Sequence, residues 1–299
     1  MAGWQFRPAK HIQRLMAVDV MRRLSVLRPL KQYRYVGFGG YEFVDFDLVH
    51  RQLGIDRMTS IESSSKLQRF EFNRPFPDIV VLGGTSNDVL QTIPLDDPLI
   101  VWLDYCKGLR RQELQDVRLL GEHLRPGSML LVTVNAATPE DGTRIDVLTE
   151  RVGSERIPLH ITEERHLDGW DYAITQRRIL ADELHEGIAA RGPSRRFEQL
   201  LDVHYRDTQR MQTWGGLIAD EGYEARVALA DFSSLDQVRR AGEAPLRISV
   251  PVLTVREVLK LEEGLSSGGA TPRLPWLKDS ESDSFTELHR WYPPVPAPM

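Results

Sequence analysis

The chain has 299 residues, of which 41% are hydrophobic and 27% charged, and its formal net charge is -5. This composition is typical of a globular protein and excludes collagen-like, disordered and disulfide-stapled descriptions of the whole chain. The charge balance argues against a general polyanion binder, and the single cysteine, Cys106, excludes an internal disulfide and a thiolate zinc site. No apolar run reaches the roughly 18 residues of a membrane helix and no secretory signal is evident, so we expect a cytoplasmic protein.

The first 34 residues are basic, with eight Lys or Arg and one acid, Asp19. Apolar residues at helical spacing between Ile12 and Leu24 predict an amphipathic helix within residues 1–32, with a basic solvent-facing side. Two interpretations stay open for this helix. It packs as a cover on the domain, or it offers a docking surface for nucleic acid or an acidic partner.

Strands and helices alternate between residues 33 and 134. The apolar segments predict strands at 33–38, 58–62, 78–82, 99–103 and 128–134, and the segments between them predict helices at 43–53, 65–72 and 109–124. Nearly all-apolar strands that alternate with helices are typical of a parallel sheet covered on both faces. We therefore expect a doubly wound α/β fold.

Residues 136–210 interrupt this alternation. A crossover needs only about a dozen residues, so we interpret the stretch as a helical insertion that serves as a lid or substrate wall. Its sequence predicts helices at 144–152, 174–190 and 195–205, and a short strand at 159–161.

The chain after the insertion completes the predicted domain. Strands are expected at 211–219 and 246–253, followed by a helix at 254–264, so that a single domain covers 1–264. The tail, 265–299, is rich in Ser, Gly and Pro, and we expect it to be loosely ordered or to dock on a partner.

A glycine cluster and an acid follow the first two predicted strands. Gly37, Gly39 and Gly40 let a ligand approach the backbone closely, although a tight turn also needs glycine. Glu62 lies 22 residues after Gly40, at the end of the second strand. An acid there accepts the hydroxyl protons of a ribose, so the pair predicts a ligand that contains a nucleoside. The alternative is a surface carboxylate that caps a turn.

Polar residues also follow the next three strands. Thr85 and Ser86 lie where they either contact a base or cap a helix. Asp104 ends the fourth strand, beside the point where the strand order should reverse, and a carboxylate there faces the ligand crevice. Asn135 either turns into the same crevice or caps a helix. We interpret Cys106 as a small apolar filler rather than a nucleophile.

No histidine motif for a metal or a catalytic pair is present. Four histidines lie within the insertion, and each is either structural or a candidate general base: His160, His166, His185 and His204.

Together these residues resemble a class I S-adenosylmethionine-dependent methyltransferase, over roughly residues 30–135. The resemblance implies a seven-stranded sheet whose last strand runs antiparallel, and S-adenosylmethionine as cofactor. It also implies roles for individual residues: the glycines approach the methionine part, Glu62 holds the ribose, and Thr85 and Ser86 contact the adenine. The chain is also similar to bacterial O-methyltransferase-like proteins of unassigned substrate.

The segment from Leu103 to Lys107 is similar to metal-dependent O-methyltransferases of small molecules. That resemblance implies that Asp104 is a magnesium ligand and that Lys107 takes the acceptor proton. We also expect Asp104 to lie near the sulfonium or ammonium group of the cofactor, and Tyr105 to contact the cofactor. Asn135 matches one magnesium ligand of those enzymes, but Val134 stands where a second Asp is expected. The remaining ligands make a thin shell for Mg²⁺, so we assign no residue to a metal site and leave Mg²⁺ open as a second cofactor.

The sequence also bears on three other functions. A methyltransferase fold without turnover would serve as a sensor or assembly module, including one in a bacterial phage-defence system. An NAD-dependent oxidoreductase needs a third glycine, yet Phe43 and Asp45 occupy that region. The amino-methyltransferases of DNA need a Pro pair after the fourth strand, and the only Pro pair is Pro293–Pro294. The acceptor stays open, as a small molecule, RNA or a protein, and so does a protein partner or homo-oligomer.

Overall fold

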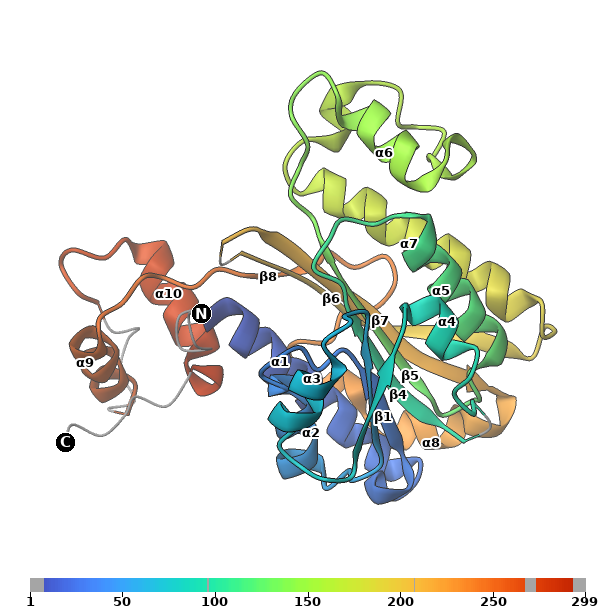
Figure 1. The fold of residues 1–299 in the computed structure, drawn as a ribbon. Coiled ribbons are helices and arrows are strands. Elements are labelled where there is room, and N and C mark those ends of the chain that lie inside the picture. Colours follow the sequence, from blue (N-terminus) through green and yellow to red (C-terminus); the bar gives the residue numbers. More distant parts are fainter. Residues whose placement is uncertain (1–7, 96, 207, 267–272, 293–299) are drawn as a thin grey trace.

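The computed structural model describes residues 8–95, 97–206, 208–266 and 273–292. One sheet with helices on both faces forms its centre (Figure 1). The strands are β1 (Arg34–Gly37), β2 (Met58–Glu62), β3 (Ile79–Gly83), β4 (Leu99–Asp104), β5 (Met129–Asn135), β6 (Arg195–Arg206), β7 (Arg210–Asp220) and β8 (Leu246–Ile248). The α-helices are α1 (Pro8–Arg22), α2 (Val44–Leu53), α3 (Leu67–Asn73), α4 (Ser86–Leu90), α5 (Arg111–His123), α6 (Arg144–Val152), α7 (Asp171–Ala189), α8 (Glu224–Leu229), α9 (Val255–Ser266) and α10 (Asp279–Leu288). Short 3₁₀ helices span Arg23–Val26, Leu30–Gln32, Ser154–Arg156, Glu164–Leu167, Glu221–Tyr223, Phe232–Ser234 and His289–Trp291.

The sheet has the strand order β3-β2-β1-β4-β5-β7-β6-β8. Strand β7 is antiparallel to both of its neighbours, and the other pairs are parallel. The order reverses between β1 and β4, where Val36 pairs with Val101, so the carboxyl ends of these two strands border a crevice. The predicted fold class is confirmed. The sheet has eight strands, one more than the resemblance implied.

Two apolar cores lie on the two faces of the sheet. Helices α1, α2 and α8 contribute to one core, and α5, α6 and α7 contribute to the other. Helix α1 buries Ile12, Met16 and Val20 completely or nearly so, which confirms that it packs on the domain. Helices α5 and α7 touch through glycines, because a Cβ at Gly187 would lie 2.3 Å from the backbone oxygen of Arg118. No helix among the described residues is long and apolar enough to cross a membrane.

The elements predicted for residues 33–134 are confirmed to within two residues at either end. Helices α6, α7 and α9 and strand β7 are confirmed as well. These segments follow the simple periodicities, because each buries a regular apolar face or an all-apolar core strand.

The helix predicted at 195–205 is wrong, because this segment forms strand β6. A register shift between Gln199 and Leu201 interrupts the alternation of side chains, as a β-bulge does. In addition, β6 lies inside the sheet and buries the polar residues Gln199, Asp202 and His204, so it is not the nearly all-apolar run that predicts a buried strand. The helical insertion before β6 therefore comprises residues 136–194.

Three smaller predictions also differ from the structure. Residues 159–161 form no strand, and the last strand covers Leu246–Ile248 rather than 246–253. In the tail, α10 is an ordered helix that buries Phe285 in a small apolar cluster with α9. The rest of the prediction for the two ends of the chain falls on residues 1–7, 267–272 and 293–299, outside the described residues.

Candidate functional site

The glycine turn after β1 approaches β2 closely. A Cβ at Gly39 would lie 2.4 Å from the ring of Phe43 and 2.8 Å from Ser60 Oγ, so only glycine fits there. Gly40 has a φ of +58°, a conformation that favours glycine. The backbone N–H of Gly39 donates to Ser60 Oγ (2.9 Å) and that of Gly40 to Glu62 Oε1 (3.1 Å). The turn is thereby fixed to the end of β2.

Glu62 is 6% exposed at the carboxyl end of β2. Its Oε1 accepts hydrogen bonds from Ser60 Oγ (2.7 Å) and from Gly40 N–H. Burial raises the pKa of this carboxyl, and the two hydrogen bonds oppose that shift. Oε2 accepts no hydrogen bond from the part of the chain that the structure describes. One oxygen therefore holds the turn, and the other is available to a ligand.

The polar residues after β3 serve partly as structure. Thr85 caps α4, since its Oγ1 accepts from the N–H of Asp88 and donates to that carboxylate (2.6 Å). Ser86 Oγ and Tyr105 Oη both donate to Asp116 Oδ2, the latter over 2.6 Å. Burial raises the pKa of Asp116, which is fully enclosed. The hydroxyls of Ser86 and Tyr105 are thus committed to fixing a wall of the site.

Asp104, at the end of β4, meets two basic side chains from α1. Lys10 Nζ lies 2.7 Å from Asp104 Oδ2, and Arg14 Nη2 lies 4.0 Å from the same oxygen. Asp104 Oδ1 is buried and has no hydrogen-bond partner among the described residues. The sequence predicted the carboxylate at this place but not the two cations.

These groups line one cavity of about 710 Å³ at the carboxyl ends of β1 to β4, a volume within the usual range for small-molecule sites. The structure brings together all but one of the predicted site residues on its wall: Gly39, Gly40, Glu62, Thr85, Ser86, Asp104, Tyr105 and Lys107. Gly37 is the exception. It lies within β1, where a Cβ would be 3.0 Å from the backbone oxygen of Trp102.

Sequence reasoning missed several wall residues, namely Lys10, Arg14, Asp45, Gln112 and Glu113. Asp45 lies in the first turn of α2, accepts a 2.5 Å hydrogen bond from Tyr35 Oη and has a pKa raised by burial. Glu113 lies in the first turn of α5, and its Oε2 is buried without a hydrogen-bond partner in the described chain. The sequence contains a signal for Asp45 and Glu113, because both are acids at the start of a predicted helix that directly follows a strand end.

The insertion does not reach this cavity. None of the lining residues comes from 136–194, so the predicted lid does not form a wall of it. The four candidate histidines do not line it either. His204 is fully buried, stacks on Trp170 and has a pKa lowered to about 4 by desolvation, with nearby arginines adding to the shift.

The residues do not fit a magnesium site. Among the described residues, no group of three or more His, Cys, Asp or Glu side chains is placed to hold a metal ion. Asn135 instead accepts a hydrogen bond from Ala137 N–H (2.8 Å) and donates to Gln209, and Val134 is fully buried. Asn135 therefore caps its own loop rather than turning into the cavity.

Residues 3–295 match the protein family described as "Putative O-methyltransferase". The chain belongs to this family. The search of curated proteins gives no match to the sequence.

Solved structures give distant similarities. The mitomycin 7-O-methyltransferase MmcR is 15% identical over 68% of this chain and 54% of its own, with a TM-score of 0.37. Human N-acetylserotonin methyltransferase, in complex with SAM, is 13% identical over 72% of this chain and 56% of its own, with a TM-score of 0.35. An O-methyltransferase family protein from Burkholderia thailandensis is 12% identical over 69% of this chain and 56% of its own, with a TM-score of 0.39. The chain spans about half the length of these proteins, and the similarities are too distant to transfer a substrate.

Proposed function

We propose that the protein binds S-adenosylmethionine in the cavity and transfers its methyl group to a hydroxyl of an acceptor. The observation that carries the proposal is the pairing of the glycine turn with Glu62. A buried carboxylate on the wall of a cavity, with one oxygen bonded to the turn, suits the two hydroxyls of a ribose. Family membership supports the same chemistry.

The residues on the wall fit such a donor in its several parts. The absence of side chains at Gly39 and Gly40 leaves room for close approach, and Glu62 would hold the ribose. Thr85 and Ser86 would border the adenine with their backbone, since their hydroxyls bond within the protein. Asp104 Oδ1, buried and unpartnered in the described chain, suits a cationic group.

When bound, S-adenosylmethionine supplies a methyl group on a sulfonium, which is displaced in line. The acceptor oxygen would bond to the methyl carbon, the carbon–sulfur bond would break with its electron pair going to sulfur, and the hydroxyl proton would pass to a base of the protein. Lys107 lines the same cavity and would take that proton, while the walls align the reactants and exclude water.

Calorimetry with S-adenosylhomocysteine tests the proposal. We expect the protein to bind this product, and Glu62→Gln to weaken binding by roughly tenfold to a hundredfold, because an amide replaces a charged acceptor. Glu71→Gln, on the exposed surface of α3, is the matched control and should bind like the unchanged protein. No heat and no thermal stabilisation at millimolar ligand would remove the cofactor from the proposal.

Turnover separates an enzyme from a sensor. Production of S-adenosylhomocysteine that depends on added hydroxyl compounds supports the enzyme. Tight binding of the nucleoside without turnover on small molecules, RNA or protein would support the sensor or assembly role instead.

A further inference from the structure

A second cavity, of about 690 Å³, lies at the opposite edge of the sheet, where β4, β5 and β6 begin. Its wall combines residues 90–95 before β4, the end of α5, and the segment between α7 and β6. Helices α5 and α7 pack side by side above it (Figure 1). The six residues of β4 span about 20 Å, so a ligand here does not touch the wall of the first cavity.

The charged wall residues of this second cavity within the described chain are all basic. The end of α5 contributes His123 and Arg125, and the segment from α7 to β6 contributes Arg191 and Arg195. These four side chains come from two separate parts of the sequence and meet only in the fold. The cavity therefore suits an anion.

Two of the arginines are held in place by the end of α5. Arg191 Nε donates to the backbone oxygen of Glu122 (2.7 Å), and Arg195 Nη1 donates to that of Leu124 (3.3 Å). Neither arginine has an ion-pair partner among the described residues. A guanidinium has five N–H donors, so each of the two has four more to offer a ligand.

The positive charges also act on one another. Burial lowers the pKa of Arg195, and Arg191 and Arg125 lower it further, while Asp220 on the neighbouring strand β7 opposes the shift. An anion that carries several charges would replace this repulsion with attraction. Much of the remaining wall is apolar, namely Leu90, Ile93, Pro94, Leu95 and Leu119.

We propose that this second cavity binds an oligophosphate, either as the inorganic ion or as part of a nucleotide. Arg191 and Arg195 are its anchors, because planar guanidiniums bind phosphate oxygens through paired hydrogen bonds. Arg125 and His123 lie beside them on the same wall. The apolar side of the cavity leaves a place for a nucleotide base. The inference is independent of the proposed function, since it uses no residue of the first cavity.

A simpler explanation is that Arg191 and Arg195 only cap α5. Cations at the C-terminus of a helix are favourable and often bond its last carbonyls. In that case their removal would cost stability alone, and no oligophosphate would depend on them.

Calorimetry with inorganic tripolyphosphate and with ATP, at low and constant ionic strength, separates the two explanations. We expect both ligands to bind, and Arg191→Met and Arg195→Met each to weaken binding tenfold or more, because each removes charge-assisted contacts. Arg256→Met, on the exposed surface of α9, removes the same charge outside the cavity and should bind within twofold of the unchanged protein. Thermal unfolding shows that each variant is folded.

Tighter binding of ATP than of tripolyphosphate would support the nucleotide as the source of the phosphates, and equal binding the inorganic ion. No heat with either ligand at millimolar concentration, or binding that survives in the double variant of Arg191 and Arg195, overturns the inference. A dodecamer of uridine RNA that binds more tightly than ATP, and only when both arginines are present, also overturns it, since the surface would then serve RNA. None of these results bears on S-adenosylhomocysteine, so the proposed function is tested separately.

Discussion

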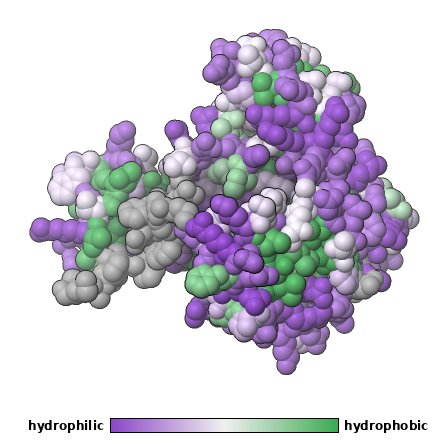
Figure 2. All heavy atoms as spheres, viewed as in Figure 1, coloured by the Kyte–Doolittle hydropathy of each residue, from purple (hydrophilic) through white to green (hydrophobic). Residues whose placement is uncertain are grey.

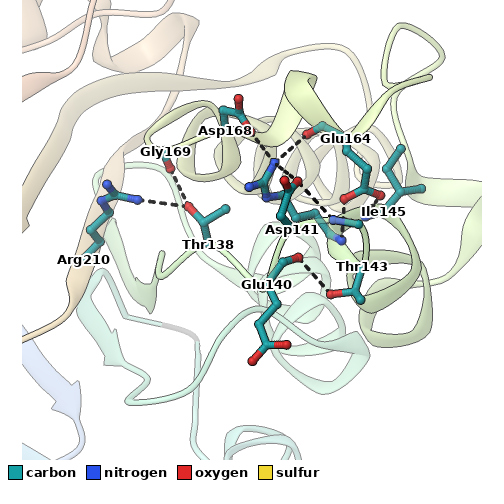
Figure 3. A network of polar contacts seen from close by, with 11 residues as sticks. Thr138, Glu140, Asp141, Thr143, Ile145, Glu164, Asp168, Gly169 and Arg210 are labelled. Atoms are coloured by element: carbon teal, nitrogen blue, oxygen red, sulfur yellow. Dashed lines mark hydrogen bonds and ion pairs between the residues drawn. The ribbon is translucent and has the colours of Figure 1, made fainter.

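Helix α1 and the insertion, residues 136–194, are both additions to the central sheet, but their charged residues are used differently. Lys10 and Arg14 of α1 find their partner in Asp104, at the end of a central strand. The insertion instead pairs its charges mostly within itself (Figure 3). Of these two additions to the sheet, α1 contributes side chains to the cavity and the insertion does not.

The network of the insertion shows this self-sufficiency. Glu164 accepts hydrogen bonds from the backbone N–H groups of Arg144 (2.7 Å) and Ile145 (3.1 Å), which satisfies the start of α6. The Arg144 guanidinium in turn bonds Asp141 and Asp168. In Figure 1 α6 stands at the top of the view, away from the sheet, and Figure 2 shows a mainly hydrophilic surface there. Because the charges in this network are paired within the insertion, they do not depend on residues of the cavity for their partners.

The comparison shows that a basic segment with few acidic residues near it in the sequence can pair with acids that are distant in the sequence. The sequence around α1 offers one acid, Asp19, against eight basic residues, so its charges must be satisfied elsewhere. These basic side chains can face solvent or bind an external polyanion, or they can pair with the acids around the cavity. The structure shows the second arrangement for Lys10 and Arg14.

The largest expected effect concerns the junction between the insertion and the sheet. His204 of β6 is buried and neutral, stacks on Trp170 of the insertion and has a pKa lowered to about 4. The unfolded chain, with a pKa near 6.5, binds a proton first as the pH falls. The stability that depends on neutral His204 is therefore full above pH 6.5 and decreases toward pH 4, by about 3 kcal/mol in all.

Denaturant unfolding at a series of pH values, for the unchanged protein and for His204→Gln, measures this effect. Buried carboxyls such as Asp202 have raised pKa values and act in the opposite direction. Because Asp202 Oδ1 lies 3.6 Å from His204 Nε2, the difference between the two proteins reports His204 together with its effect on Asp202. His166→Gln, a histidine that is not buried, should leave the pH profile as it is. Equal acid sensitivity with and without His204 would show that the junction does not titrate.

A second prediction compares one glycine in each region. Gly39→Ala places a Cβ against the fully buried ring of Phe43, and we expect S-adenosylhomocysteine to bind tenfold to a hundredfold more weakly. Gly142→Ala, in the insertion, has open space around it but a φ of +77°. It should cost about 1 kcal/mol of stability and leave binding unchanged. Equal effects on binding at the two positions would erase the distinction between the regions.

The sequence predicted the part of the site that depends on strand ends. In parallel strands the residues after each strand meet at one edge, so Glu62, Thr85 and Asp104 could be placed together from the order of elements alone. Lys10 and Arg14 could not be placed there, because no local sequence pattern indicates which strand end a helix at the start of the chain crosses. Strand β6 was misassigned for a related reason, since the partners of buried Asp202 and His204 come from β7 and α7.

The smallest expected effect tests whether the insertion is energetically separate from the cavity. Arg144→Met removes the contacts with Asp141 and Asp168, and we expect the free energy of unfolding to fall by about 1–2 kcal/mol, since Arg144 is largely buried. Arg165→Met is the control, because this exposed side chain pairs with the neighbouring Glu163, its one ion-pair partner in the described chain, and should change stability by less than about 0.5 kcal/mol. Both variants should bind S-adenosylhomocysteine within about twofold of the unchanged protein, because neither region touches the cavity. A tenfold loss of binding in the Arg144 variant, without a matching loss of stability, would instead make the insertion a working part of the site and cancel the contrast with α1.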